Sequence, residues 1–190
     1  LKNSPLFDVD EALRLFPAAR IEAVSLHGEC KELLVYDDGT GPLLTATALG
    51  AGSVTFPPEA APAPPPPTFD PTAYRYLFVP DVALQRMRLV RRALEGQADA
   101  WSQNGFAFSR RPVEGIAGRT LAIAAIEPFD AKALRRRLRG RGIELLKRDF
   151  PLTLAEIHAR TATHAGDELR LAFTRIGGRA WTIELAAENE

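Results

Sequence analysis

The chain is poor in the residues that form disulfides and metal centres. Its 190 residues include one cysteine, Cys30, and three histidines. A single thiol cannot close an intramolecular disulfide, and its isolation favours a reducing compartment. Structural zinc needs four nitrogen or sulfur ligands, whereas those present here are scattered along the chain. The sequence therefore predicts neither a disulfide framework nor a metal site.

Long apolar runs and common catalytic motifs are also missing. No run approaches the roughly 20 residues of a membrane-spanning helix, and no signal peptide opens the chain, so we expect a cytoplasmic location and no membrane partner. The glycine-rich loops G-x-x-x-x-G-K-S/T and G-x-G-x-x-G and the nucleophile motif G-x-S-x-G do not occur. A thiolate at Cys30 with His27 as its base is one interpretation, but we favour a half-buried structural cysteine. We therefore expect no catalytic residue and no bound cofactor in this chain.

The composition is that of a globular protein, with 46% hydrophobic and 25% charged residues. The first residue is Leu1 rather than methionine, and no polar segment precedes the ordered pattern. We therefore expect a piece cut from a longer protein whose chemistry lies upstream.

A proline-rich tract divides the chain into two predicted units. Residues 1–60 carry four basic and nine acidic side chains, a net charge of −5, and the remainder carries +5. Such asymmetry suggests units with different partners. Prolines in the tract remove backbone donors and fix φ, so we interpret it as a stiff spacer, with a ligand for a proline-recognising domain as the alternative. The predicted boundaries are 1–56, 57–72 and 73–190.

Before the tract, hydrophobic periodicity predicts one helix and three strands. Asp8 is suited to cap a helix that ends at Pro17. Strands are predicted over 21–26, 32–36 and 43–49. These elements cannot cover both faces of a sheet, which indicates the end of a larger α/β sheet.

After the tract, the pattern predicts a small α/β domain. Thr153 and Glu156 form a capping-box signature at the start of one helix. Gly177 and Gly178 suit a two-residue hairpin turn. The other helices are expected over 81–95 and from Asp130 to 139, and the strands over 106–108, 120–126, 143–146, 169–175 and 179–185. We expect Leu169, Leu171 and Phe173 to share one sheet face with Trp181, Ile183 and Leu185.

Basic residues are concentrated in the second unit. Residues 110–148 carry eleven basic and four acidic side chains, a net charge of +7. On the helix that begins after Asp130, Leu134 and Leu138 are expected to face the core and the basic side chains to face outward. The arginine fork suits phosphate oxygens, and Gly140 and Gly142 would let a nucleic-acid backbone approach. A solvated face that only aids solubility is the alternative. The candidate RNA-binding residues are Lys132, Arg135, Arg136, Arg139, Arg141, Lys147 and Arg148.

Five segments together carry a resemblance: LKNSPLFDV at 1–9, GECKELL at 28–34, YLFVPD at 76–81, EPFD at 127–130 and KRDFPLT at 147–153. In this order the chain resembles the C-terminal half of bacterial class I S-adenosylmethionine-dependent methyltransferases that carry a THUMP-like domain. The resemblance implies that residues 1–56 end a Rossmann-like methyltransferase sheet and that 73–190 form an α/β THUMP-like domain.

The same resemblance implies a partner and a cofactor. The partner would be RNA, tRNA in particular, together with the chain's own N-terminal methyltransferase half. S-adenosylmethionine and the catalytic residues would belong to that half, because nothing here matches their motifs. The competing hypothesis is a structural or dimerisation module without RNA binding, and the sequence does not determine the oligomeric state.

Overall fold

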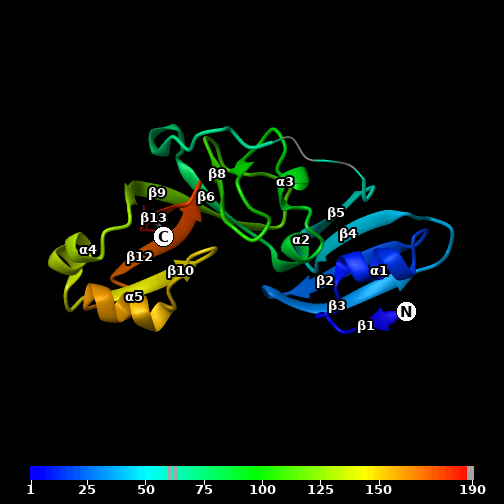
Figure 1. The fold of residues 1–190 in the computed structure, drawn as a ribbon, viewed down its shortest axis with the longest axis horizontal. Helices are drawn as coiled ribbons and strands as arrows, with labels where there is room; N and C mark the ends of the chain where they lie inside the picture. The colour runs from blue at the N-terminus through cyan, green and yellow to red at the C-terminus, as the bar shows by residue number, and fades with distance from the viewer. Residues whose placement is uncertain (60, 62–63, 188–190) are drawn as a thin grey trace.

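Two β-sheets organise the chain in a computed structural model that describes residues 1–59, 61 and 64–187 (Figure 1). The first sheet has the strand order β1-β3-β2-β4-β5. Its strands are β1 (Lys2–Asn3), β2 (Arg20–Leu26), β3 (Glu29–Tyr36), β4 (Leu43–Ala48) and β5 (Gly52–Phe56). The three predicted strands are confirmed, whereas the edge strands β1 and β5 were not predicted.

The strand directions of the first sheet are mixed. Strands β2 and β4 run parallel, and the other three pairings are antiparallel. A Rossmann-like sheet is mostly parallel, so this sheet alone does not establish one. Its interpretation as the end of a methyltransferase sheet stays a prediction.

Helix α1 (Val9–Leu15) packs on this sheet, as its sequence predicts. The Asp8 carboxylate accepts hydrogen bonds from the backbone N–H groups of Asp10 (2.9 Å) and Glu11 (3.3 Å). Two of the four donors left unpaired at a helix start are thereby satisfied. The helix can then bury Val9 and Ala12 against the strands.

The single helix expected over 81–95 is instead two short helices, α2 (Val82–Arg86) and α3 (Val90–Ala93). The break contains Arg88, whose φ of 56° is incompatible with a right-handed helix. The prediction of one helix was wrong because apolar spacing continues across the break, with Met87 and Val90 both buried.

Helix α2 covers the first sheet although it follows the proline-rich tract. Ala83, Leu84 and Met87 are buried in one core with Ile21 and Leu33. Full burial of a side chain the size of leucine contributes about 1.5–3 kcal/mol. Residues from both sides of the tract therefore build a single core.

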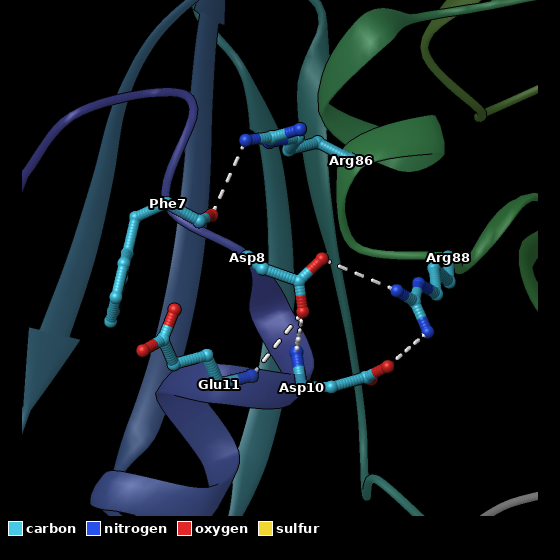
Figure 2. A network of polar contacts seen from close by, with 6 residues as sticks. All are labelled: Phe7, Asp8, Asp10, Glu11, Arg86 and Arg88. Carbon is cyan, nitrogen blue, oxygen red and sulfur yellow. Dashed lines mark hydrogen bonds and ion pairs between the residues drawn. The ribbon is translucent and has the colours of Figure 1, made fainter.

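Polar contacts fasten the α2–α3 bend to the start of α1 (Figure 2). Arg86 donates to the backbone carbonyl of Phe7 (3.3 Å). Arg88 donates to the carboxylates of Asp10 (2.5 Å) and Asp8 (3.4 Å). Because the Arg88 pairs are exposed to solvent, water and salt screen them and they contribute little to stability. They orient elements that the core already holds together.

The second sheet has the order β11-β10-β12-β13-β9-β6-β8-β7. Strand β10 runs parallel to β11 and β12, and the remaining neighbours are antiparallel. Its strands are β6 (Tyr76–Pro80), β7 (Asp99–Ala100), β8 (Ala107–Ser109), β9 (Gly118–Pro128), β10 (Gly142–Lys147), β11 (His164–Ala165), β12 (Leu169–Ile176) and β13 (Arg179–Leu185). Besides α2 and α3, which lie between β6 and β7, the described helices in this part are the 3-10 turn η1 (Pro71–Ala73), α4 (Ala131–Leu138) and α5 (Leu154–Thr161).

The β12–β13 hairpin confirms its turn and corrects its predicted faces. Both turn glycines have positive φ, 57° and 80°. Phe173 lies opposite Thr182, and Ala172 lies opposite Ile183. A two-residue turn pairs odd-numbered with even-numbered residues, and side chains alternate along a strand. The expectation that Phe173 and Ile183 share a face was therefore wrong.

Both faces of the second sheet are covered, which explains why two apolar sets exist. Phe173 belongs to a core with Leu134 and Leu138 of α4 and Ile157 of α5. Ile183 belongs to a separate core on the other face, which is rich in aromatic rings. The rings of that second core are Phe69, Tyr74, Trp101, Phe106, Phe108 and Trp181.

The described part of the proline-rich tract lies against the rest of the protein. The Trp101 indole N–H donates to the carbonyl of Pro66 (3.2 Å), and Arg92 donates to the carbonyl of Ala61 (3.1 Å). Residues 60, 62 and 63 of the tract lie outside the described residues. Its role as a stiff spacer stays a prediction.

Helix α5 begins with the predicted capping box. The Thr153 hydroxyl accepts from the backbone N–H of Glu156 (3.2 Å), and the Glu156 carboxylate accepts from the backbone N–H of Thr153 (2.7 Å).

Within the described residues, no helix is both long and apolar enough to cross a membrane.

We expect Thr153→Ala to lower the free energy of unfolding by about 1 kcal/mol, because alanine cannot accept the capping hydrogen bond. Urea denaturation followed by circular dichroism measures this change. Thr153→Ser is the matched control and retains the cap, so equal losses in both variants would contradict the assignment.

Candidate nucleic-acid interface

Helix α4 presents a basic outer face because its inner face is anchored. The Asp130 carboxylate accepts from the backbone N–H groups of Lys132 (2.8 Å) and Ala133 (3.1 Å), which starts the helix as predicted. Leu134 and Leu138 are buried against α5 and the second sheet. Four predicted residues consequently lie exposed on the outer side: Lys132, Arg135, Arg136 and Arg139.

These four side chains, which we call the α4 basic face, form no ion pair with any residue that the structure describes. Arg137 differs, because it reaches Glu184 (3.1 Å) and Glu127 (3.9 Å). The α4 basic face thus keeps its donors exposed, although the Asp130 carboxylate at the helix start interacts with the charges of Arg136 and Lys132. It is available to an external anion.

The structure gives Arg141 an internal role. Its guanidinium donates to Glu168 (3.1 Å), which also accepts from the backbone N–H of Gly142 (2.8 Å). A Cβ at Gly142 would lie 3.2 Å from the Cα of Gly166. The expectation that Gly142 serves the approach of nucleic acid is therefore wrong, because this glycine permits close packing of two internal segments. Gly140 faces open space.

Lys147 and Arg148 lie at the far end of β10, about 17 Å from its start for a strand of this length. The Lys147 ammonium donates to the carbonyl of Phe150 (3.4 Å). The half-buried Arg148 donates to the side chain of Gln85 on α2. The structure thus brings four of the predicted residues together and places these two elsewhere.

Arg148 has a neighbour that sequence reasoning did not connect with it. The pKa of Arg148 is lowered, first by burial and also by the charge of Arg119. Arg119 lies at the start of β9 and is exposed. No local pattern joins residues 29 positions apart, so only the fold could reveal this pair.

The remaining chemical candidates do not form a reactive site. Burial raises the pKa of the Cys30 thiol, which is opposite to the shift that a nucleophilic thiolate requires. His158 is hydrogen-bonded to the Thr163 hydroxyl (2.8 Å). In the described ranges, no group of three or more histidine, cysteine, aspartate or glutamate residues is arranged to hold a metal ion.

Comparisons with known proteins agree with this architecture. Residues 118–187, from β9 to β13, match the "THUMP domain-like" family, and this segment contains all seven predicted RNA-binding residues. A solved structure described as "putative methyltransferase from Porphyromonas gingivalis W83" is similar to this chain with a TM-score of 0.81 and 22% sequence identity. The alignment covers 99% of this chain and 50% of that one. No curated protein matches the sequence.

These findings establish a fold rather than an activity. The solved structure shares the arrangement of both sheets at an identity too low to transfer a function. The chain spans half the length of that neighbour. The match over residues 118–187 and the two sheets confirm the prediction of a mixed α/β protein with a THUMP-like domain.

The Asp130 cap of α4 should make the free energy of unfolding depend on pH. Hydrogen bonds from the backbone N–H groups of Ala133 and Lys132 hold the pKa of Asp130 below its ordinary value of 3.8. Because the pKa of Asp130 is lower in the folded chain than in the unfolded chain, its ionised carboxylate stabilises the fold at pH values above the unfolded-chain pKa. This stabilisation is lost as the pH falls through the pKa of the folded chain. Asp130→Asn still caps the helix but cannot titrate.

We therefore expect the unfolding free energy of Asp130→Asn to decrease less than that of the wild type between about pH 5 and about pH 2.5. Urea titrations at several pH values provide the measurement. Asp37→Asn, at an exposed aspartate that caps no helix, is the control. Parallel pH curves for Asp130→Asn and the wild type would refute the role of the cap.

Proposed function

We propose that this chain is the RNA-docking part of an S-adenosylmethionine-dependent RNA methyltransferase, with tRNA as its substrate class. The observation that carries the proposal is the α4 basic face, an unpaired positive surface within the THUMP-like segment. The methyltransferase assignment is supported by the resemblance of the sequence and by the printed description of the structural neighbour.

The cofactor belongs to the other half of such an enzyme. Among the described glycines with positive φ, none lies between a strand and the helix that follows it: Gly28 lies between β2 and β3, Gly177 between β12 and β13, and Gly140 between α4 and β10. A cofactor loop of the Rossmann type instead lies between a strand and the helix of a parallel unit. We therefore assign the cofactor to the other half of the enzyme and to none of the described residues.

The geometry of α4 suits the backbone of a folded RNA. Lys132, Arg136 and Arg139 are spaced i, i+4 and i+7, which places them along one side of a helix, and Arg135 lies one turn from Arg139. A rigid helix holds these charges at a fixed spacing of about 5–6 Å per turn. Contacts of this kind read phosphate position and helix shape rather than base sequence. They also release counterions, so the affinity should fall steeply with salt.

We expect the triple variant Arg135→Ala, Arg136→Ala and Arg139→Ala to bind tRNA more weakly than the wild type. Each lost phosphate contact should remove about one unit from the slope of log affinity against log salt. Fluorescence anisotropy between about 50 and about 200 mM salt measures both quantities.

The matched control removes the same charge from the first sheet and α1, as Lys2→Ala, Arg14→Ala and Lys31→Ala. Each of these side chains is exposed and paired with a carboxylate. Duplex DNA of similar length tests the preference for RNA. Equal affinity and slope in the triple variant and the wild type would refute the α4 site. A wild type that binds no RNA and whose mass rises with concentration would favour the dimerisation module.

A further inference from the structure

A groove of about 610 Å³ lies where the two sheets meet. The first sheet contributes the β2–β3 and β4–β5 turns, and the second contributes the end of β6, the start of β9 and Arg148 after β10. Figure 1 shows α2 between the first sheet, in blue to cyan, and the second sheet. The volume is within the range of about 300–1,000 Å³ that small-ligand sites occupy.

Two guanidinium groups from different strands line this groove. Arg119 is exposed, and its side chain forms no ion pair or hydrogen bond with any residue that the structure describes. Arg148 is half-buried and oriented by its hydrogen bond to Gln85. The two charges are near enough that Arg119 contributes to the lowered pKa of Arg148. An anion between them would relieve that repulsion.

Carboxylates offset part of the charge of this pair, because Asp149 and Asp81 both act to raise the pKa of Arg148. Asp81 is the acidic residue among the described lining residues. Its carboxylate accepts from the Ser25 hydroxyl (2.5 Å) and from the backbone N–H of Ala83 (2.8 Å). Its lone pairs are thus partly used to join the first sheet to α2. Within the lining, two arginines therefore face one internally bonded aspartate, and Asp149, which lies outside the lining, reduces this positive excess at Arg148.

Glycines shape the groove for an occupant larger than water. Gly28 and Gly50 have positive φ, and a Cβ at either would meet no atom within 4 Å, so the turns border open space. Gly118 is different, because a Cβ there would lie 2.4 Å from the Phe78 ring. Because Gly118 has no Cβ, β9 can begin beside β6. This places the next residue, Arg119, at the edge of the groove.

We propose that the inter-sheet groove binds a phosphate group between Arg119 and Arg148. This inference rests on the proposed function in one respect: the phosphate is a backbone phosphate of the RNA that docks on α4. Strand β10 connects the two places, with α4 before its start and Arg148 after its end, and the strand itself is about 17 Å long. RNA bound in this way would contact both sheets and hold them in one relative orientation.

Arg119→Gln tests the groove, because the side chain is exposed and its replacement leaves the cores intact. We expect tRNA affinity to fall about tenfold and the salt slope to fall by about one unit. The matched control is Arg111→Gln, an exposed arginine outside the lining of the groove. It should leave both quantities close to those of the wild type.

A second measurement uses inorganic phosphate as the probe and does not depend on RNA. In amide NMR spectra of the full chain, we expect phosphate to shift the Gly28, Gly50 and Gly118 signals saturably in the wild type and not in Arg119→Gln. RNA binding that is unchanged in Arg119→Gln, with no saturable shift, overturns the groove and leaves the α4 site intact. Saturable shifts without RNA binding by the wild type support the groove as a site for free phosphate and overturn the proposed function.

Discussion

The arrangement of this chain depends on the burial of α2 against the first sheet. Ala83, Leu84 and Met87 complete a core that the strands before the proline-rich tract cannot close alone. Because the same short helix continues from β6, its burial ties the second sheet to the first. Two hydrogen bonds lie at this junction, one from Ser25 to Asp81 and one from Arg148 to Gln85. Because hydrogen bonds are directional, they fix the relative orientation of elements that apolar packing holds together. The groove between the sheets is a consequence of that attachment.

A second constraint determines what the surface offers to a partner. Helix α4 must bury Leu134 and Leu138 to cover the Phe173 face of the second sheet. Once it does, four basic side chains can lie only on the solvent side. Neighbouring arginines with nearby carboxylates, such as Arg137 and Arg141, are used within the protein. Folding therefore sorts a continuous arginine-rich segment into residues that are paired within the protein and exposed residues that form no ion pair with the described part of the chain.

Local signals were the reliable part of the sequence. The Asp8 and Asp130 caps, the capping box at Thr153 and the two-glycine turn were all predicted, because each satisfies backbone groups within a few residues. Errors arose where apolar spacing alone was interpreted. Arg88 interrupts an apparently continuous helix, and the hairpin places its two apolar sets on opposite faces because the sheet is covered on both sides.

For the candidate site, the residue pattern was enough to predict that α4 is amphipathic and that its outer face is basic, because a capped helix with two buried leucines leaves no other orientation. The pattern also predicted the order and type of most elements. The positions of Lys147 and Arg148 away from α4, the pairing of Arg141 with Glu168 and the approach of Arg119 to Arg148 follow from the packing of the fold. Those relations depend on strand order and on how α2 attaches one sheet to the other. Contacts between residues far apart in the chain arise from the packing of whole elements, which no local pattern encodes.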